Sequence, residues 1–437
     1  MPNVERPNIL FCLFDSLSVL DWTEKSSSPE LDAGLTTLSQ LRSKGAFFNR
    51  TYAPCPESSP ARASLFTGLD PSVHGLWTNG VALSDNEQTF VQRLAQAGYT
   101  NYLAGRYQLA GLSRWTTEQA RQNEFNQMDW AHGPLHRSRQ NAYLAWLAQS
   151  APKHYSKIFT TQADPENTIA PDEQRAALAA LPEALSFNNW VGLRVGEWIE
   201  KQSLDKPFMA MAGFCVGDTL GSEPHSITDG ESINAQALQQ ADTAIGQILE
   251  KLAANNRAKD TVIIVTAARG NTNTLTATDA LSEYAIRVPI IINGETIEQR
   301  IVDEPMSTMD IAPTVLDMAN VPIGARAQGQ SLLGVLNGSE KPRGWALSRI
   351  RKQNMASGAR NWQSALCMKK MKLVVCHDNE QEHQETIKLF NLQTDPLEQN
   401  NLAGLDAHAA ELEQMIDQMI DARCAMEDRT EPRIAEF

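Results

Sequence analysis

The stretch Ser58-Ser59-Pro60-Ala61-Arg62-Ala63-Ser64-Leu65-Phe66-Thr67, followed by Gly68, decides the fold of this 437-residue chain. Pro60 suits the first turn of a helix, because its missing N–H would have no partner there. The stretch therefore predicts a short helix that ends at Thr67-Gly68, with Ser58 just ahead of its N-terminus. Free backbone N–H groups and the positive end of the helix dipole would then face an anion beside Ser58.

The composition is that of an acidic globular protein. Lys and Arg total 38 against 52 Asp and Glu, which gives a formal net charge of −14. No Lys/Arg-rich run interrupts this acidity, so neither nucleic acid nor an anionic membrane is expected as a partner. An anionic ligand would need a local positive pocket. The length favours roughly two or three domains, and the oligomeric state stays open.

The first apolar run, Ile9 to Phe14, predicts a buried strand. It is too short for a signal-peptide core or a membrane span, and it is flanked by Pro7 and Asp15. We therefore predict a cytoplasmic protein. The cysteines lack metal-ligand spacing and are predicted to stay reduced, without disulfides; they are Cys12, Cys55, Cys215, Cys367, Cys376 and Cys424.

Short apolar runs alternate with longer amphipathic stretches, which is typical of a mainly parallel α/β sheet covered by helices on both faces. Predicted strands are Asn8 to Phe14, Tyr99 to Leu103, Phe208 to Phe214, Thr261 to Thr266 and Val288 to Ile292. Predicted helices are Glu87 to Ala97, Phe187 to Gln202 and Ala235 to Ala254.

A composition shift around 337–343 predicts a boundary between a main domain, 1–340, and a smaller C-terminal subdomain, 341–437. The subdomain is expected to begin with a strand at 345–350 and to end in a helix at about 405–423. The polar stretch 114–172 predicts an inserted helical or loop region.

Several further segments, in this order, make the chain resemble the sulfatases of the alkaline phosphatase superfamily. They are Pro7-Asn8-Ile9-Leu10-Phe11-Cys12-Leu13-Phe14-Asp15, Asp70-Pro71-Ser72-Val73-His74-Gly75, Ile286-Arg287-Val288-Pro289, Met309-Asp310-Ile311-Ala312-Pro313-Thr314 and Leu389-Phe390-Asn391-Leu392-Gln393-Thr394-Asp395-Pro396-Leu397-Glu398. The resemblance implies an alkaline-phosphatase-like α/β fold with a small C-terminal sheet-and-helix subdomain. It gives Ser58 the nucleophile position and Arg62 the family arginine.

The resemblance also implies a divalent metal, usually calcium, held by acidic and amide or imidazole side chains. Where two adjacent acids close the first strand, this chain has Asp15-Ser16, and where a later strand ends in metal ligands it has Ala268-Arg269. Hard cations need several oxygen ligands. We therefore predict that the calcium site is lost and that no cofactor is bound. A companion hypothesis is that Arg269 bonds Asp15 in the vacated space.

Other positions implied by the resemblance are altered as well. Arg106 replaces a lysine and Gln108 a histidine, and glutamine cannot exchange a proton near neutral pH. A Pro-His pair expected after the strand at 208–214 is replaced by Gly217-Asp218, although His225 could substitute if its loop bends back. The lysine expected shortly before the Arg-Val-Pro strand is missing, since 271–285 contains no Lys.

Several of these residues have both a structural and a functional interpretation. Ser58 is either a helix N-terminal serine or a nucleophile, and its oxidation to formylglycine is not expected where the surrounding chemistry has decayed. Arg62 either faces an anion or forms a structural ion pair. His74 is expected to stabilise the nucleophile helix rather than to transfer protons.

Two functions are compatible with these residues. The favoured one is a non-catalytic, sulfatase-like protein whose Ser58, Arg62, Arg106 and Arg269 bind a small anionic ligand, or which serves a protein partner. The alternative is a sulfuric or phosphoric ester hydrolase in which Ser58 attacks and Arg62, Arg106 and Arg269 neutralise the transferred group. The first is favoured because loss of the metal removes Lewis-acid stabilisation and the means of activating the nucleophile.

Overall fold

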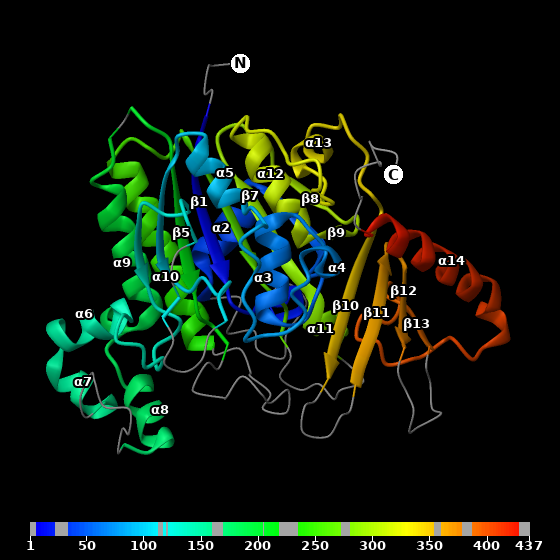
Figure 1. Ribbon diagram of the computed structural model, residues 1–437, viewed down its shortest axis with the longest axis horizontal. Helices are drawn as coiled ribbons and strands as arrows, with labels where there is room; N and C mark the ends of the chain where they lie inside the picture. The colour runs from blue at the N-terminus through cyan, green and yellow to red at the C-terminus, as the bar shows by residue number, and fades with distance from the viewer. Residues whose placement is uncertain are drawn as a thin grey trace, which may run out of the picture.

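The main sheet is nine-stranded in the described part of the chain, with the order β4-β3-β5-β1-β6-β7-β2-β8 and with β9 paired to β2 (Figure 1). The computed structural model describes residues 6–21, 34–111, 117–118, 121–159, 169–203, 205–217, 235–271, 280–353, 360–377 and 387–427. The strands are β1 Asn8–Phe14, β2 Ala46–Tyr52, β3 Thr100–Gly105, β4 Gln127–Trp130, β5 Phe208–Phe214, β6 Thr261–Ala267, β7 Arg287–Asn293, β8 Arg300–Val302 and β9 Met306–Ser307.

Five neighbouring strands of this sheet, β4, β3, β5, β1 and β6, run parallel, whereas β7 is antiparallel to both β6 and β2. The central strands β1, β5 and β6 are buried along their whole length, as expected for parallel strands covered on both faces. Because parallel strands end at the same edge, the residues after β1, β3, β5 and β6 gather there.

Helices cover both faces of the sheet, as predicted. Alternate residues of β1 pack on opposite sides, Leu10 with the cluster that includes α9 and α10 and Phe11 with the cluster that includes α3, α5 and α12. The helices are α2 Thr36–Lys44, α3 Ser58–Thr67, α4 Pro71–His74, α5 Phe90–Gln96, α6 Ala142–Ser150, α7 Pro152–Ile158, α8 Pro171–Ala179, α9 Phe187–Ile199, α10 Ala235–Ala254, α11 Glu283–Ile286, α12 Ile311–Met318, α13 Leu332–Leu336 and α14 Ala409–Ala425. Short 3₁₀ helices are η1 Val19–Asp21, η2 Glu183–Leu185, η4 Thr308–Asp310 and η5 Asp406–His408.

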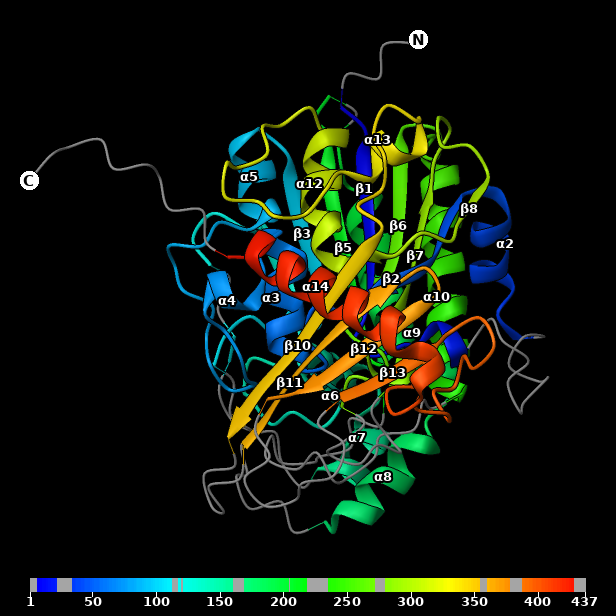
Figure 2. The same ribbon diagram turned by 90° about the vertical axis from the view of Figure 1, so that its right-hand side faces the viewer.

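A second, antiparallel sheet follows in the C-terminal part of the chain, in the order β10-β11-β12-β13. Its strands are β10 Trp345–Gln353, β11 Arg360–Met368, β12 Met371–Cys376 and β13 Ile387–Asn391. Figure 2 shows α14 lying across this sheet, where Met415, Met419 and Ala422 pack on its apolar residues. The expected C-terminal sheet and helix are therefore present.

Two parts of the sheet differ from the sequence prediction. The strand β2 was not predicted, because the polar pair Asn49-Arg50 interrupts its apolar residues, and its pairing with β7 shifts register there. The stretch 114–172 was predicted as an insertion, yet it contributes β4 to the main sheet beside β3, in addition to α6 and α7.

The remaining expectations concern the membrane and the thiols. Among the described residues, none of the helices combines the length and the apolar character that a bilayer crossing requires. All six cysteines carry free thiols. The cellular location and the boundary near 340 stay predictions.

Candidate functional site

The helix α3 ends where the sequence predicts, but it begins one residue earlier than expected. Ser58 is its first residue, and Gly68 ends it in the left-handed conformation with φ of 72°. Two of the N–H groups expected to be free are engaged, since Ser59 N–H donates to Asn79 Oδ1 (2.9 Å) and Ala61 N–H donates to the carbonyl of Glu57 (3.0 Å). Donors for an anion beside Ser58 must therefore come mainly from side chains.

His74, the last residue of α4, is hydrogen-bonded to α3, in agreement with its expected structural role. Its Nδ1 accepts from Leu76 N–H (3.1 Å), so Nε2 carries the proton and donates to Ser64 Oγ at 2.9 Å. Burial lowers the pKa of His74 to about 3. The imidazole is therefore neutral near physiological pH, and it is not a proton donor for catalysis there.

The buried, neutral His74 predicts a specific dependence of stability on pH. Since its pKa is lower in the folded state, the unfolded chain binds the proton first, and stability present above about pH 6.5 is lost as the pH falls. We expect this group alone to contribute a slope of about 1.4 kcal/mol per pH unit between pH 6 and pH 4. Urea unfolding of a His74→Asn variant should give a slope shallower by that amount, and equal slopes in both proteins would contradict a neutral His74.

Arg62 lies wholly inside the protein. Its Nη1 donates to the carbonyl of Tyr107 (3.1 Å), whereas Nε and Nη2 are shielded from solvent and have no hydrogen-bond partner among the described residues. Burial, followed by repulsion from Arg106, lowers the pKa of Arg62 to about 10. Arg62 is thus a cation at neutral pH with unused donors, which is costly in a protein interior unless an anion accepts from them.

Arg106 follows β3 and pairs with Asp15 at the end of β1. Its Nη1 lies 3.0 Å from Asp15 Oδ2, and its Nε donates to Gln108 Oε1 at 2.8 Å. The other oxygen of Asp15, Oδ1, accepts from the backbone N–H groups of Val216 (2.8 Å) and Gly217 (3.3 Å). Both carboxylate oxygens of Asp15 are therefore engaged by protein donors.

Arg269 does not reach Asp15, so the companion hypothesis is wrong. Its Nε donates to Ser58 Oγ at 3.0 Å, and its Nη1 donates to the carbonyl of Gly270 at 3.2 Å. No ion pair joins Arg269 to Asp15 among the described side chains, because Arg106 already fills that role. The sequence-predicted residues Ser58, Arg62, Arg106 and Arg269 nevertheless converge on one edge of the sheet, and we call these four, with Asp15, the arginine cluster.

The donor set at this edge does not fit a calcium ion. Ser16 Oγ is a neutral, buried hydroxyl, Ala268 offers a methyl group and Arg269 a cation. Asp15 supplies the carboxylate, already bonded to three donors. Within the ranges that the structure describes, no group of three or more His, Cys, Asp or Glu side chains is arranged to hold a metal ion, and hard cations require several oxygen ligands.

His132 is a site residue that was not predicted from the sequence. It follows β4 at the same edge, and its Nε2 lies 3.4 Å from Arg106 Nη2. Arginine can only donate, so Nε2 accepts and Nδ1 carries the proton; Nδ1 is shielded and lacks a partner among the described residues. Burial and then repulsion by Arg106, His136 and Arg62 hold its pKa well below the usual range. A strand assignment for 127–130 would have drawn attention to it.

Other predicted positions take no direct part in this cluster or only support it. Gly217 contributes its backbone N–H to Asp15, and Gln108 serves as an acceptor for Arg106. Gln108 has a φ of 64°, and Glu118 fixes its loop by accepting from the N–H groups of Gln108 and Ala110. Asp218 and His225 lie outside the described residues.

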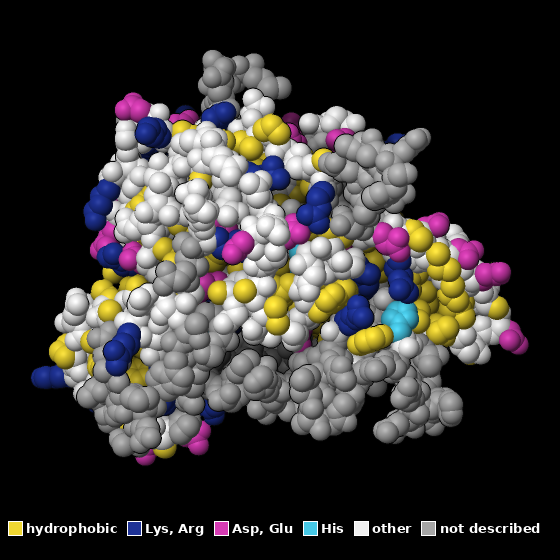
Figure 3. Space-filling model, in the orientation of Figure 1, with side chains coloured by type: hydrophobic (Ala, Val, Ile, Leu, Met, Phe, Trp, Pro, Cys, Tyr) yellow, Lys and Arg dark blue, Asp and Glu magenta, His cyan; other side chains and the backbone are white. Residues whose placement is uncertain are grey.

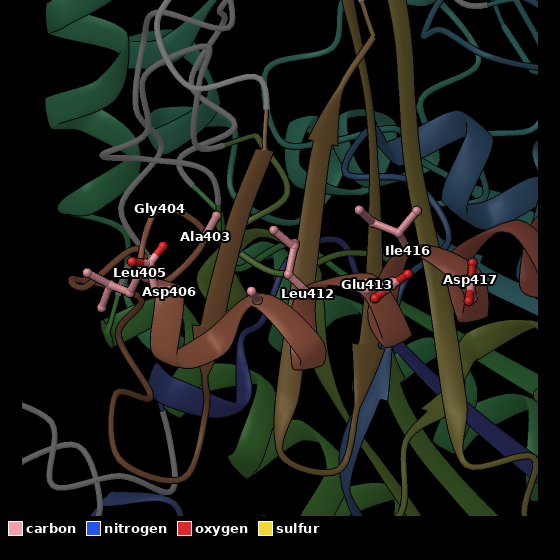
Figure 4. A pocket seen from close by; sticks show the side chains of 9 residues that line it. Ala403, Gly404, Leu405, Asp406, Leu412, Glu413, Ile416 and Asp417 are labelled. Atoms are coloured by element: carbon pink, nitrogen blue, oxygen red, sulfur yellow. The ribbon is translucent and has the colours of Figure 1, made fainter.

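A hollow with a volume of about 290 Å³ lies on the C-terminal subdomain instead (Figure 4). Figure 3 shows hydrophobic side chains along α14 with acidic ones beside them. The carboxylates of Asp406, Glu413 and Asp417 in this hollow would repel an anion. The arginine cluster is therefore the better candidate for an anion site. The residues that line it are Ala403, Gly404, Leu405, Asp406, Ala409, Leu412, Glu413, Ile416 and Asp417.

Known protein families match nearly the whole chain. The family model described as Sulfatase matches residues 7–184 and 229–321. A second family model, N-sulphoglucosamine sulphohydrolase, C-terminal, matches residues 279–425. Together these matches span both the main sheet and the C-terminal sheet.

Individual relatives are distant in sequence, but the similarity extends over most of their length. The uncharacterized sulfatase YidJ of Escherichia coli (strain K12) is 24% identical over 376 residues, which cover 78% of this chain and 72% of that protein. Arylsulfatase K of Xenopus laevis is 21% identical over 452 residues, which cover 92% of this chain and 80% of that protein. The structure of a phosphonate monoester hydrolase from Silicibacter pomeroyi superimposes with a TM-score of 0.74 at 18% identity, covering 97% of this chain and 96% of that one. The predicted fold class is confirmed.

Proposed function

The chain belongs to the sulfatase family, and we propose that within it this protein is a non-catalytic binder of tetrahedral oxyanion esters that works without a metal. The observation that carries the proposal is a cation at an implied metal-ligand position: Arg269 stands there and bonds Ser58 Oγ, while Arg106 pairs with Asp15. Among the described side chains of the arginine cluster, three guanidinium groups face one carboxylate, and this excess of positive charge suits an anion.

The chemistry of the cluster supports binding more than turnover. Charge-assisted hydrogen bonds from guanidinium groups hold sulfate and phosphate oxygens well. A serine nucleophile needs a base or a metal to remove its proton, yet the described partner of Ser58 Oγ is the cation Arg269. His132 bonds Arg106 rather than Ser58, and Gln108 cannot protonate a leaving group.

A metal-independent ester hydrolase is the second candidate, and one observation favours it. Arg269 Nε lies 3.0 Å from Ser58 Oγ, and a guanidinium at this distance favours the alkoxide form of a hydroxyl. In that case Ser58 would attack the sulfur or phosphorus, and Arg62 and Arg106 would neutralise the transferred group.

A hydrolysis assay separates the two candidates. We expect release of 4-nitrophenol from 4-nitrophenyl sulfate and phosphate to be the same for the protein and its Ser58→Ala variant, with or without added Ca²⁺. Peptide mass spectrometry is the control, because a loss of about two daltons would reveal oxidation of Ser58 to formylglycine. We expect unmodified serine. Turnover that disappears in Ser58→Ala would establish the hydrolase.

A further inference from the structure

We propose that the arginine cluster, together with His132, selects oxyanions that carry no proton, such as sulfate monoesters and phosphate diesters, over the hydrogen phosphate form of phosphate monoesters. This inference rests on the proposed function, since it concerns the ligand of the same site. It follows from which hydrogen-bonding atoms of the site are already used and which are not.

The hydrogen-bond acceptors that the described residues bring to the site already have donors. Asp15 accepts from Arg106 through Oδ2 and from two backbone N–H groups through Oδ1. Gln108 Oε1 accepts from Arg106 Nε, and His132 Nε2 faces Arg106 Nη2. A ligand that brings its own proton would therefore have to displace one of these bonds to find a strong acceptor.

The unused atoms are mainly donors. Arg62 Nε and Nη2 and His132 Nδ1 are shielded and have no hydrogen-bond partner among the described residues. Ser58 Oγ accepts from Arg269, which leaves its own O–H to donate. Ser16 Oγ is a hydroxyl that could also accept, but it is neutral and a weaker acceptor than a carboxylate.

His132 owes this donor role to its neighbour. Arg106 holds Nε2 as an acceptor, and this fixes the tautomer whose Nδ1 carries the hydrogen. His132 is thus a specificity-determining residue for the ligand. Like the arginines it donates a hydrogen bond, although it carries no charge. The ring of His136 lies beside it, with centroids 5.0 Å apart.

The physical cost of a protonated ligand sets the size of the selectivity. A hydrogen phosphate would point its O–H at a buried donor and leave that donor without an acceptor, which lowers affinity roughly ten- to a hundredfold. The second proton of a phosphate monoester leaves near pH 6, whereas a sulfate monoester is already unprotonated. Selectivity should therefore vanish at high pH and increase at low pH.

Titratable and charged groups from every element around the cluster bear on this pH dependence. Arg62 keeps its charge, because its pKa of about 10 lies above the range used, and burial raises the pKa of Cys215 to about 12, so this thiol stays neutral. Among the described residues these groups are Asp15 after β1, Arg62 on α3, Arg106 after β3, Glu118 in the following loop, His132 and His136 after β4, Cys215 after β5 and Arg269 after β6.

Calorimetric titration of the full chain with phenyl sulfate and phenyl phosphate at pH 5.0 and pH 8.0 tests the inference. Affinity for phenyl sulfate should be the same at both pH values, whereas affinity for phenyl phosphate should fall about tenfold on going from pH 8.0 to pH 5.0, as the monoanion replaces the dianion. Equal pH dependence for the two ligands would overturn the selectivity but leave the proposed function standing. Absence of binding for both would overturn the two together.

Variants of His132 make the test specific for this residue. His132→Asn keeps a side-chain donor and should retain most of the sulfate affinity, whereas His132→Leu should lose about tenfold. His132→Asp supplies the missing acceptor and should reverse the preference at pH 5.0 in favour of phenyl phosphate. A thermal unfolding curve checks that each variant folds, and unchanged preference in a folded His132→Asp would overturn the role of His132.

Discussion

Replacing Asp15 by alanine is expected to lower the free energy of unfolding by about 3–5 kcal/mol, because it removes one partner of a buried ion pair. Asp15 is 2% exposed, and its loss would leave Arg106 beside Arg62 without a compensating carboxylate. The backbone N–H groups of Val216 and Gly217 would lose their acceptor as well. Urea unfolding in sulfate-free buffer measures the change.

A matched control uses the same substitution at an exposed ion pair. Asp172, whose side chain is 93% exposed, pairs with Arg175 at 3.2 Å, and Asp172→Ala should change stability by less than about 1 kcal/mol. The affinity of Asp15→Ala for sulfate should rise rather than fall, since a negative charge has left the cluster. A variant as stable as the control would show that Asp15 is not the counter-ion of Arg106.

Replacing Arg62 by methionine is expected to weaken sulfate binding by more than about tenfold. Arg62 offers two unused, shielded donors, Nε and Nη2, and a hydrogen bond to a charged group contributes about 1.5–3 kcal/mol. Stability in sulfate-free buffer should change little or rise, because methionine keeps much of the volume and removes a buried cation that Arg106 repels. Calorimetry measures the change in sulfate affinity, and urea unfolding measures the change in the free energy of unfolding.

Arg287→Met provides the opposite pattern as a control. Arg287 is also buried, but it lies 3.6 Å from Glu283 and donates to Asn49, so its loss should destabilise the fold while leaving sulfate affinity unchanged. If Arg62→Met behaves like Arg287→Met in both measurements, Arg62 is a structural ion and the arginine cluster does not bind anions through it.

Local signals in the sequence were sufficient for much of the fold. Gly68 predicted the end of α3 and Pro60 its start to within one residue, and the wholly buried strands β1 and β5 have the predicted bounds. The strand β4 was missed because it is only four residues long, three of them are at least partly exposed, and it lies in a polar stretch. Because β4 was not predicted, His132 was not predicted as a site residue either. Only the pairing of β4 with β3 brings that histidine to the edge where Arg106 lies.

The pairing inside the arginine cluster could not be predicted for a different reason. The sequence identified Asp15, Arg106 and Arg269 as residues that follow strands, but it does not give the direction of a long side chain. Arg269 follows β6, the immediate neighbour of β1, yet it extends to Ser58. Arg106 follows β3, which β5 separates from β1, and reaches Asp15 instead. Sequence position and strand order alone favour the wrong partner.

Calorimetric titration of sulfate into the protein after dialysis against EDTA, repeated after addition of Ca²⁺, decides whether the site binds anions without a metal. We expect saturable sulfate binding in EDTA, because Arg62, Arg106 and Arg269 are the protein's own cations, and the same affinity when Ca²⁺ is present. Sulfate binding that is absent in EDTA and restored by Ca²⁺ would contradict a metal-free anion site, because the site would then hold a metal despite Ser16, Ala268 and Arg269.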